Sequence, residues 1–232
     1  MPLNGLLQWL QQLELGSLVE MAVIVAASLL CITVHETCHG LVALWLGDQT
    51  AKRQGRLSLN PLRHVDPMGL VMMALVRFGW AKPVPIDMRN FRNPKTGMAL
   101  TALGGPVSNV ILALVAMLLR ACLYPSYLVS GTPVLSYGML FLEYVAVLSA
   151  GLAVFNLFPV PPLDGSKVLF AVLPSHWYRK LMRYERYGMI LLAVLLLTNI
   201  LDVPLMFLRS KLLDILTWIT TPVFQFFLDC VI

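Results

Sequence analysis

Charged side chains are scarce in this sequence. Only 12% of the 232 residues are Asp, Glu, Lys or Arg, 58% are hydrophobic, and the mean hydropathy is +0.77. This composition excludes an ordinary soluble domain and predicts a polytopic membrane protein. No stretch of about 80 residues or more is polar enough to form a separate soluble domain, so we expect no appended PDZ-like or nucleotide-binding module.

Two other shortages narrow the class of function. The four cysteines include no C-x-x-C pair and three of them lie in apolar segments, so we interpret them as small buried side chains rather than zinc ligands. The chain has 12 acidic residues against 17 Lys and Arg, and the basic residues cluster in two loops between apolar runs. That distribution is typical of membrane topology, and we therefore expect no nucleic-acid partner.

One apolar run contains the sequence His35-Glu36-Thr37-Cys38-His39. Two histidines four residues apart lie on one face of a helix, where both imidazoles can bind a single metal ion. Glu36 lies beside that face, where its carboxylate can take a proton from a water activated by the metal. Ionisable groups in a membrane-length helix each cost about 2 kcal/mol or more unless they pair or bind something. The pattern therefore predicts a metal site inside the membrane.

We expect five to six transmembrane helices in three parts: an amphipathic segment (1–17), a catalytic transmembrane core (18–174) and C-terminal transmembrane helices (175–232). The predicted spans cover 18–46, 97–119 and 135–158, with weaker candidates at 187–207 and 212–228 and a loop at 120–133. The two basic loops, at 48–95 and 167–186, should face the cytoplasm, which places the active site toward the cytoplasmic side.

The segment that follows the first span is expected to be a short re-entrant element. Its apolar part, Met68 to Val76, is too short to cross a bilayer as a helix. The next residues include Pro83 and Pro85, which remove backbone donors and favour extended geometry. Extended backbone at membrane depth must line protein or a wet cavity.

A catalytic zinc needs a third protein ligand besides the two histidines. Position 45, six residues after His39, is a tryptophan, and no acid occurs between Asp48 and Asp66. Asp164 is the first candidate, because Pro159, Pro161 and Pro162 break the preceding span and Gly165 permits a sharp turn. Asp66 is the second candidate. His64 and His176 are expected to be ordinary residues of the basic loops.

Three motifs occur in this order: His35-Glu36-x-x-His39, Gly105-Pro106-x-x-Asn109 and Asn156-x-x-Pro159-x-Pro161-x-Leu163-Asp164-Gly165. Because of these motifs, the sequence resembles the site-2 protease family of intramembrane zinc metalloproteases (M50 type), in its compact, PDZ-less branch. The resemblance covers about residues 34 to 174. The resemblance implies that His35, His39 and Asp164 bind one Zn²⁺ and that Glu36 is the catalytic acid/base. It also implies an all-α membrane protein with a re-entrant extended or β element after the first catalytic helix.

The resemblance further implies hydrolysis of peptide bonds in or near the transmembrane segments of membrane-protein substrates, in a bacterial or archaeal cell membrane. Asn109 and Asn156 would hold the substrate backbone or an oxyanion, although either could instead be an interhelical hydrogen-bonding group. An unwound substrate would pair with the extended segment Trp80, Ala81, Lys82, Pro83, Val84 and Pro85. Two alternatives stay open: a non-proteolytic zinc-binding protein, such as a metal carrier or helix-binding scaffold, and a structural bundle without metal.

Overall fold

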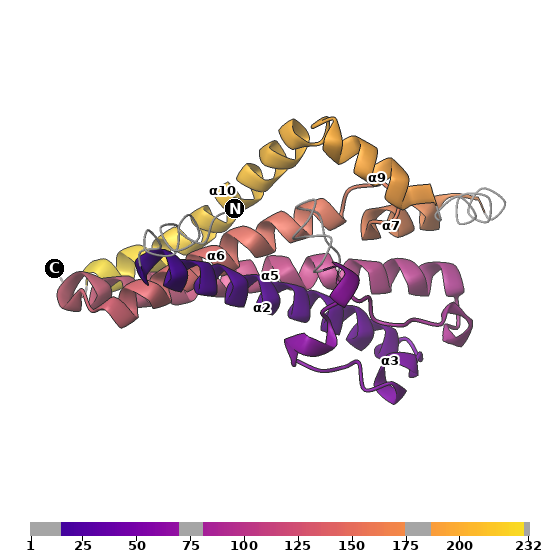
Figure 1. The fold of residues 1–232 in the computed structure, drawn as a ribbon, viewed down its shortest axis with the longest axis horizontal. Coiled ribbons are helices and arrows are strands. Elements are labelled where there is room, and N and C mark those ends of the chain that lie inside the picture. The colour runs from indigo at the N-terminus through magenta and orange to yellow at the C-terminus, as the bar shows by residue number, and fades with distance from the viewer. Residues whose placement is uncertain (1–14, 70–80, 175–186, 230–232) are drawn as a thin grey trace, which may run out of the picture.

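Four long helices dominate the computed structural model, which describes residues 15–69, 81–174 and 187–229 (Figure 1). They are α2 (Leu15–Trp45), α5 (Pro94–Ser130), α6 (Pro133–Asn156) and α10 (Asp202–Asp229). The shorter elements are α3 (Thr50–Arg53), α7 (Asp164–Val172), α9 (Gly188–Leu197) and the 3₁₀ turns η1 (Pro61–Arg63) and η2 (Met88–Asn90). The described residues contain no β-strand, only an isolated antiparallel bridge between Val65 and Ala81. The expectation of a nearly all-helical protein is confirmed.

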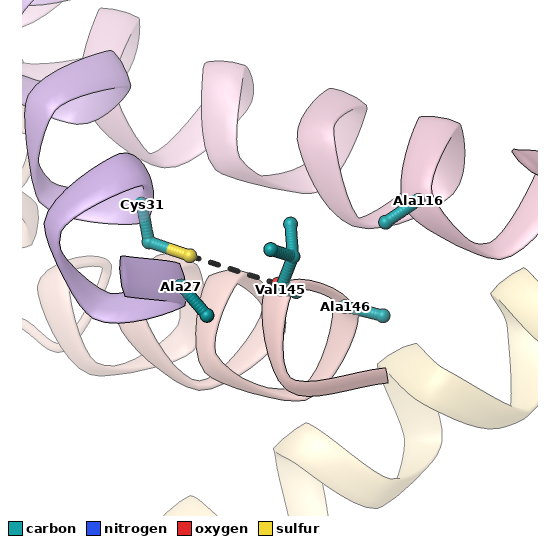
Figure 2. Close-up of a cluster of buried hydrophobic side chains, with 5 residues drawn as sticks. All are labelled: Ala27, Cys31, Ala116, Val145 and Ala146. Atoms are coloured by element: carbon teal, nitrogen blue, oxygen red, sulfur yellow. Dashed lines mark hydrogen bonds between the residues drawn. The ribbon is translucent and has the colours of Figure 1, made fainter. Parts of the chain in front are cut away.

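All four long helices are apolar and long enough to cross a membrane. Helix α5 packs against α2, α6 and α10, and the bundle is closed by small side chains that let the helices approach one another. Figure 2 shows one such cluster, in which Ala27 and Cys31 of α2 lie beside Val145 and Ala146 of α6, with Ala116 of α5. Cys31 is buried and free, as predicted.

Two predicted boundaries are wrong. Helix α5 continues through 120–130, with Pro125 inside it, and ends only at Gly131, whose φ is +54°. Within this part Arg120 pairs with Glu143 of α6 at 3.0 Å. Helix α10 is continuous through the charged residues that were expected to separate two spans. Charge alone does not break a helix, and the actual break precedes α10 at Asn199, which has a φ of +56°.

Four helices of the described residues could span a membrane, which is fewer than the five or six expected. Residues 1–14 of the predicted amphipathic segment, Trp80 and His176 lie outside the described residues, and residues 15–17 of that segment belong to α2. Residues 82–87 form no regular element, so the extended conformation agrees with the proline pattern, and the re-entrant path stays a prediction.

The end of α2 directs the following loop back along the helix. The N–H of Gly47 donates to Leu44 O at 3.1 Å and that of Asp48 to Ala43 O at 2.9 Å, a Schellman motif with Gly47 at φ +106°. The returning loop then bonds to α2, because Thr37 Oγ1 donates to Ser58 O at 3.0 Å. Thr37 lies eight residues before the end of α2, or about 12 Å along the helix axis.

Candidate metal centre

Three buried side chains from distant parts of the chain meet at one point. His35 and His39 come from α2 and Asp164 is the first residue of α7. The two Nε2 atoms are 3.0 Å apart, and Asp164 Oδ2 lies 3.3 Å from that of His35 and 3.1 Å from that of His39. Among the described residues this is the group of histidines, cysteines and acids whose geometry can hold a metal ion. The predicted ligands are therefore adjacent, while Asp66 is not among them.

Asp164 is positioned by Gly165, which follows it, and by the proline-rich segment 159–162, which precedes it. The chain leaves α6 at Asn156 and turns through the proline-rich segment before α7 begins. A Cβ on Gly165 would overlap the backbone of Leu157 and lie 2.7 Å from Phe158 O, so only glycine permits this approach. The other carboxylate oxygen of Asp164, Oδ1, accepts from Lys167 Nζ at 3.2 Å.

Asp164 lies outside the four long helices and is ionised. Its burial alone would raise the pKa of the carboxyl, but hydrogen bonds from His35 and His39 and the charge of Lys167 lower that pKa well below its usual range. A buried carboxylate of this kind is stable only beside cations or donors.

Helix α5 positions the two imidazoles. A Cβ on Gly105 would lie 2.6 Å from His35 Nε2 and would also overlap His39, so this glycine leaves the space that both rings occupy. His39 Nδ1 lies 2.7 Å from the carbonyl oxygen of Thr101. A carbonyl only accepts, so Nδ1 carries a proton. When a metal ion is bound, this arrangement would leave the lone pair of His39 Nε2 for the ion.

The two candidate asparagines lie in different environments. Asn156 lines the cavity beside the histidines and donates from Nδ2 to Leu152 O at 3.0 Å, which leaves its Oδ1 for another partner. Asn109 is completely buried, does not line that cavity, and neither of its amide atoms has a partner among the described residues. His35 Nδ1 is also buried and has no hydrogen-bond partner among the described residues. The roles of both asparagines stay predictions.

Glu36 is held by the segment 82–90, here called the strap. The N–H of Val84 donates to Glu36 Oε2 at 3.1 Å, and the buried Val84 side chain packs over Gly40, one turn further along α2. Pro83 and Pro85 have no N–H, so Val84 offers the one backbone donor of residues 83–85, and Glu36 takes it. Strand pairing with a substrate would therefore rely on the carbonyl groups of this part of the strap.

Both ends of the strap are anchored. At its start Lys82 N donates to His64 O at 2.8 Å, and Arg56 Nη2 donates to Lys82 O at 2.7 Å. His64, expected to be an ordinary loop residue, is buried and donates from Nε2 to Ser58 O at 2.7 Å, which fixes the loop at this point.

At its other end, the strap is anchored by Asp48. This completely buried residue accepts from Asp87 N at 2.8 Å, Asn90 Nδ2 at 2.7 Å, and Thr50 N and Oγ1 at 3.0 and 2.5 Å. Burial opposes ionisation, but these donors lower the pKa of Asp48. In the sequence, Asp48 is only an acid two residues before a threonine, which is a common pattern in local turns. The sequence analysis therefore did not identify Asp48 as an anchor of the strap.

The resulting cavity has a volume of about 170 Å³. Its lining combines the metal-ligand cluster, Glu36, Asn156 and Lys167 with apolar side chains such as Met98 and Ile86. The carboxyl group of Glu36, a set of candidate metal ligands and the free amide oxygen of Asn156 in one small cavity suit the attack of water on a carbonyl group.

Comparisons with known proteins agree with this chemistry. The model of peptidase family M50 matches residues 134–200. YwhC of Bacillus subtilis (strain 168), named as a zinc metalloprotease, is 36% identical over 192 residues, which are 77% of this chain and 81% of YwhC. The chain belongs to peptidase family M50. This is the site-2 protease family, so the resemblance found in the sequence is confirmed and the protein is a zinc metalloprotease of the membrane.

Two further members of the family are similar to this M50 peptidase. Rip2 of Mycolicibacterium smegmatis is 29% identical over 184 residues, which are 77% of this chain and 68% of Rip2. Rip2 of Mycobacterium tuberculosis (strain H37Rv) is 27% identical over 183 residues, with the same coverage of both chains. Both are named as zinc metalloproteases. No solved structure matches the chain.

The cluster in this M50 peptidase fits the zinc that the family uses. Ligands of a tetrahedral zinc at about 2.0–2.1 Å are about 3.3 Å apart, close to the 3.0–3.3 Å found between the three candidate atoms. Two imidazole nitrogens and a carboxylate oxygen form a common catalytic zinc set. Asp66, the second candidate, instead accepts from Gly69 N at 2.9 Å and caps a turn.

Proposed function

We propose that this M50 peptidase hydrolyses peptide bonds in or near the transmembrane segments of membrane-protein substrates. His35 Nε2, His39 Nε2 and Asp164 Oδ2 hold the zinc, and Glu36 is the acid/base. The observation that carries the proposal is the convergence of these three ligand atoms beside Glu36 in a cavity between apolar helices.

The zinc, when bound, polarises the scissile carbonyl and lowers the pKa of water to about 7. Glu36 uses Oε1 to accept the proton of the attacking water, while Oε2 stays oriented by Val84 N–H. The carboxyl group then donates that proton to the departing amine nitrogen. The free Oδ1 of Asn156 accepts a hydrogen bond from the substrate backbone. Asn109 of α5 does not line the cavity and contributes to the packing between helices.

The substrate helix must unwind before its peptide bond can reach Glu36, because the hydrogen bonds of a helix shield its carbonyl groups. The freed N–H groups then need acceptors, since unpaired backbone groups are costly at membrane depth. The strap carbonyls of Pro83 and Pro85 supply acceptors next to the cavity, as in β-augmentation. In this form of the predicted strand pairing, the strap only accepts hydrogen bonds from the substrate backbone and donates none.

The cavity opens toward the cytoplasmic side in this proposal. The basic residues of 48–95 are connected to the ends of α2 and α5 that are near the metal-ligand cluster, and loops rich in Lys and Arg remain in the cytoplasm. Cytosolic water then reaches Glu36 without crossing lipid.

The decisive experiment compares the wild-type chain with Glu36→Gln in membranes of the host. We expect the variant to lose cleavage by about 10²–10⁴-fold, the range of general acid–base catalysis, while its zinc content stays at about one per chain. Released membrane peptides are measured by mass spectrometry and zinc by metal analysis. Full cleavage by Glu36→Gln would refute the acid/base role. Zinc without any cleavage in the wild type would favour a binding protein.

A further inference from the structure

A second cavity, of about 360 Å³, lies on the outer side of the strap and loop 54–65. Three cationic side chains line it: Arg56, Arg63 and Lys82. No acidic side chain contributes to its lining, and none of the three cations belongs to an ion pair of the described residues. A concave site with three uncompensated positive charges favours an anion.

The two arginines are fixed in place while most of their donors stay free. Arg56 donates from Nη2 to Lys82 O at 2.7 Å, and Arg63 donates from Nη1 to Gly55 O. The Nε of Arg56 is buried and has no partner among the described residues. An arginine presents five donors in a planar fork that suits phosphate oxygens, so each side chain retains donors for a ligand.

The surroundings of this cavity are apolar and exposed. Leu62 lines the cavity and is 77% exposed, and Leu59 in the same loop is 72% exposed. The loop is bonded to α2 at Thr37, about 12 Å before the end of this membrane-spanning helix. The cavity therefore combines cations with exposed leucines, in a loop that is bonded to a membrane-spanning helix; interfacial lipid sites use this combination of side chains.

We propose that this cavity binds the phosphate group of an anionic phospholipid. Arg56, Arg63 and Lys82 contact the phosphate, and Leu59 and Leu62 lie against the acyl chains. Because Arg56 also holds the carbonyl of Lys82, the bound headgroup stabilises the start of the strap. That last consequence for the active site rests on the proposed proteolytic function, whereas lipid binding itself does not.

The test measures lipid retention by the full-length chain. The protein in detergent is incubated with equal amounts of phosphatidylglycerol and phosphatidylcholine, repurified, and its lipid is quantified by mass spectrometry. We expect the wild type to retain phosphatidylglycerol in preference. Lys82→Gln and Arg63→Gln should each reduce that retention about fivefold, the effect of one interfacial charge. Glu36→Gln should retain lipid like the wild type, which separates this result from proteolysis.

Matched controls come from α3, where Lys52 and Arg53 are exposed and do not line the cavity. Lys52→Gln and Arg53→Gln remove the same charge and should leave retention unchanged. Lys82 Nζ makes no hydrogen bond with the described residues, so Lys82→Gln tests the charge even if Arg63→Gln misfolds. Equal losses in the controls or equal retention of both lipids would overturn the assignment.

Discussion

The two walls of the cavity at the candidate metal centre are built by different means. On the α2 wall, hydrogen bonds join residues far apart in the sequence: Glu36 to Val84, His39 to Thr101, and Asp48 to Asp87. On the α7 wall, Asp164 is placed by local close packing, in which Gly165 lies against the backbone of Leu157. The α2 wall depends on individual hydrogen bonds, and the α7 wall depends on the absence of a side chain at Gly165. Substitutions should therefore act differently on the two walls.

The largest effect is expected from Asp164→Ala on the α7 wall. Removal of a direct ligand should lower zinc affinity by more than the roughly 10–100-fold that a neighbouring hydrogen-bond partner contributes, and cleavage should fall below detection. Asp66→Ala is the matched control, because Asp66 caps a turn outside the cluster. Metal analysis measures the zinc. Unchanged zinc in Asp164→Ala would move the third ligand to another residue.

Gly165→Ala should damage the same wall without removing a ligand. The added methyl group overlaps Leu157 backbone, which cannot give way as a flexible side chain could. We expect α7 to shift and zinc affinity to fall about 10–100-fold. Gly151→Ala of α6 is the control, since its Cβ would meet Arg209 Cδ at an ordinary 3.6 Å. If both variants kept wild-type zinc affinity, close packing would not be what positions Asp164.

The difference between the walls also explains what the sequence could predict. The histidine pair, the proline-rich turn and Asp164-Gly165 are local patterns, each with a physical reason that is visible in a few adjacent residues. They made Asp164 the first candidate for the third ligand before the family resemblance implied the same residue, and the structure brings it to the two histidines. The strap contacts join residues 39 and 48 positions apart, and no local pattern specifies such pairs. Asp48 was missed for this reason.

The two wrong helix limits had different causes. The loop at 120–133 was expected from its proline and glycine residues, and the break before 212 was expected from charged residues. Arg120 lies within α5 and pairs with Glu143 of α6, and Lys211 lies within α10 beside Asp214 at 3.5 Å. Glu143 cannot be recognised as a partner before the helices are placed, whereas Lys211 and Asp214 are three residues apart and could have been paired from the sequence. Glycine and asparagine would have been better guides, because the left-handed backbone at Gly131 ends α5 and that at Asn199 marks the break before α10.

On the α2 wall, Val84→Pro should lower turnover more than stability. It removes the one N–H that orients Glu36 Oε2, and a catalytic group displaced by about 1 Å can lose about 10²-fold in rate. Val84→Ala keeps the N–H and loses only packing over Gly40, so its turnover should stay near that of the wild type. Cleavage of a helical substrate is the measurement, with thermal unfolding measured in parallel. Equal turnover of the two variants would contradict the role of this hydrogen bond.

The smallest effect on cleavage is expected from Asp48→Asn, which acts on the strap from its far end. One acceptor oxygen is replaced by an NH₂ group, so a buried donor loses its partner, at a cost of about 1–3 kcal/mol in stability. Asp87→Asn is the control, because Asp87 bonds the exposed Arg89, and it should change stability little. Thermal unfolding followed by circular dichroism measures both variants at pH 7.

The pH dependence separates the charge of Asp48 from simple packing. The folded-state pKa of Asp48 lies below the ordinary value of 3.8, so its ionisation stabilises the fold above pH 3.8 and this contribution disappears as the pH falls through the folded-state pKa. The difference in melting temperature between wild type and Asp48→Asn should therefore be full at neutral pH and shrink in acid. A difference that persisted unchanged below that pKa would mean that Asp48 anchors the strap by shape alone, and the α2 wall would then resemble the α7 wall.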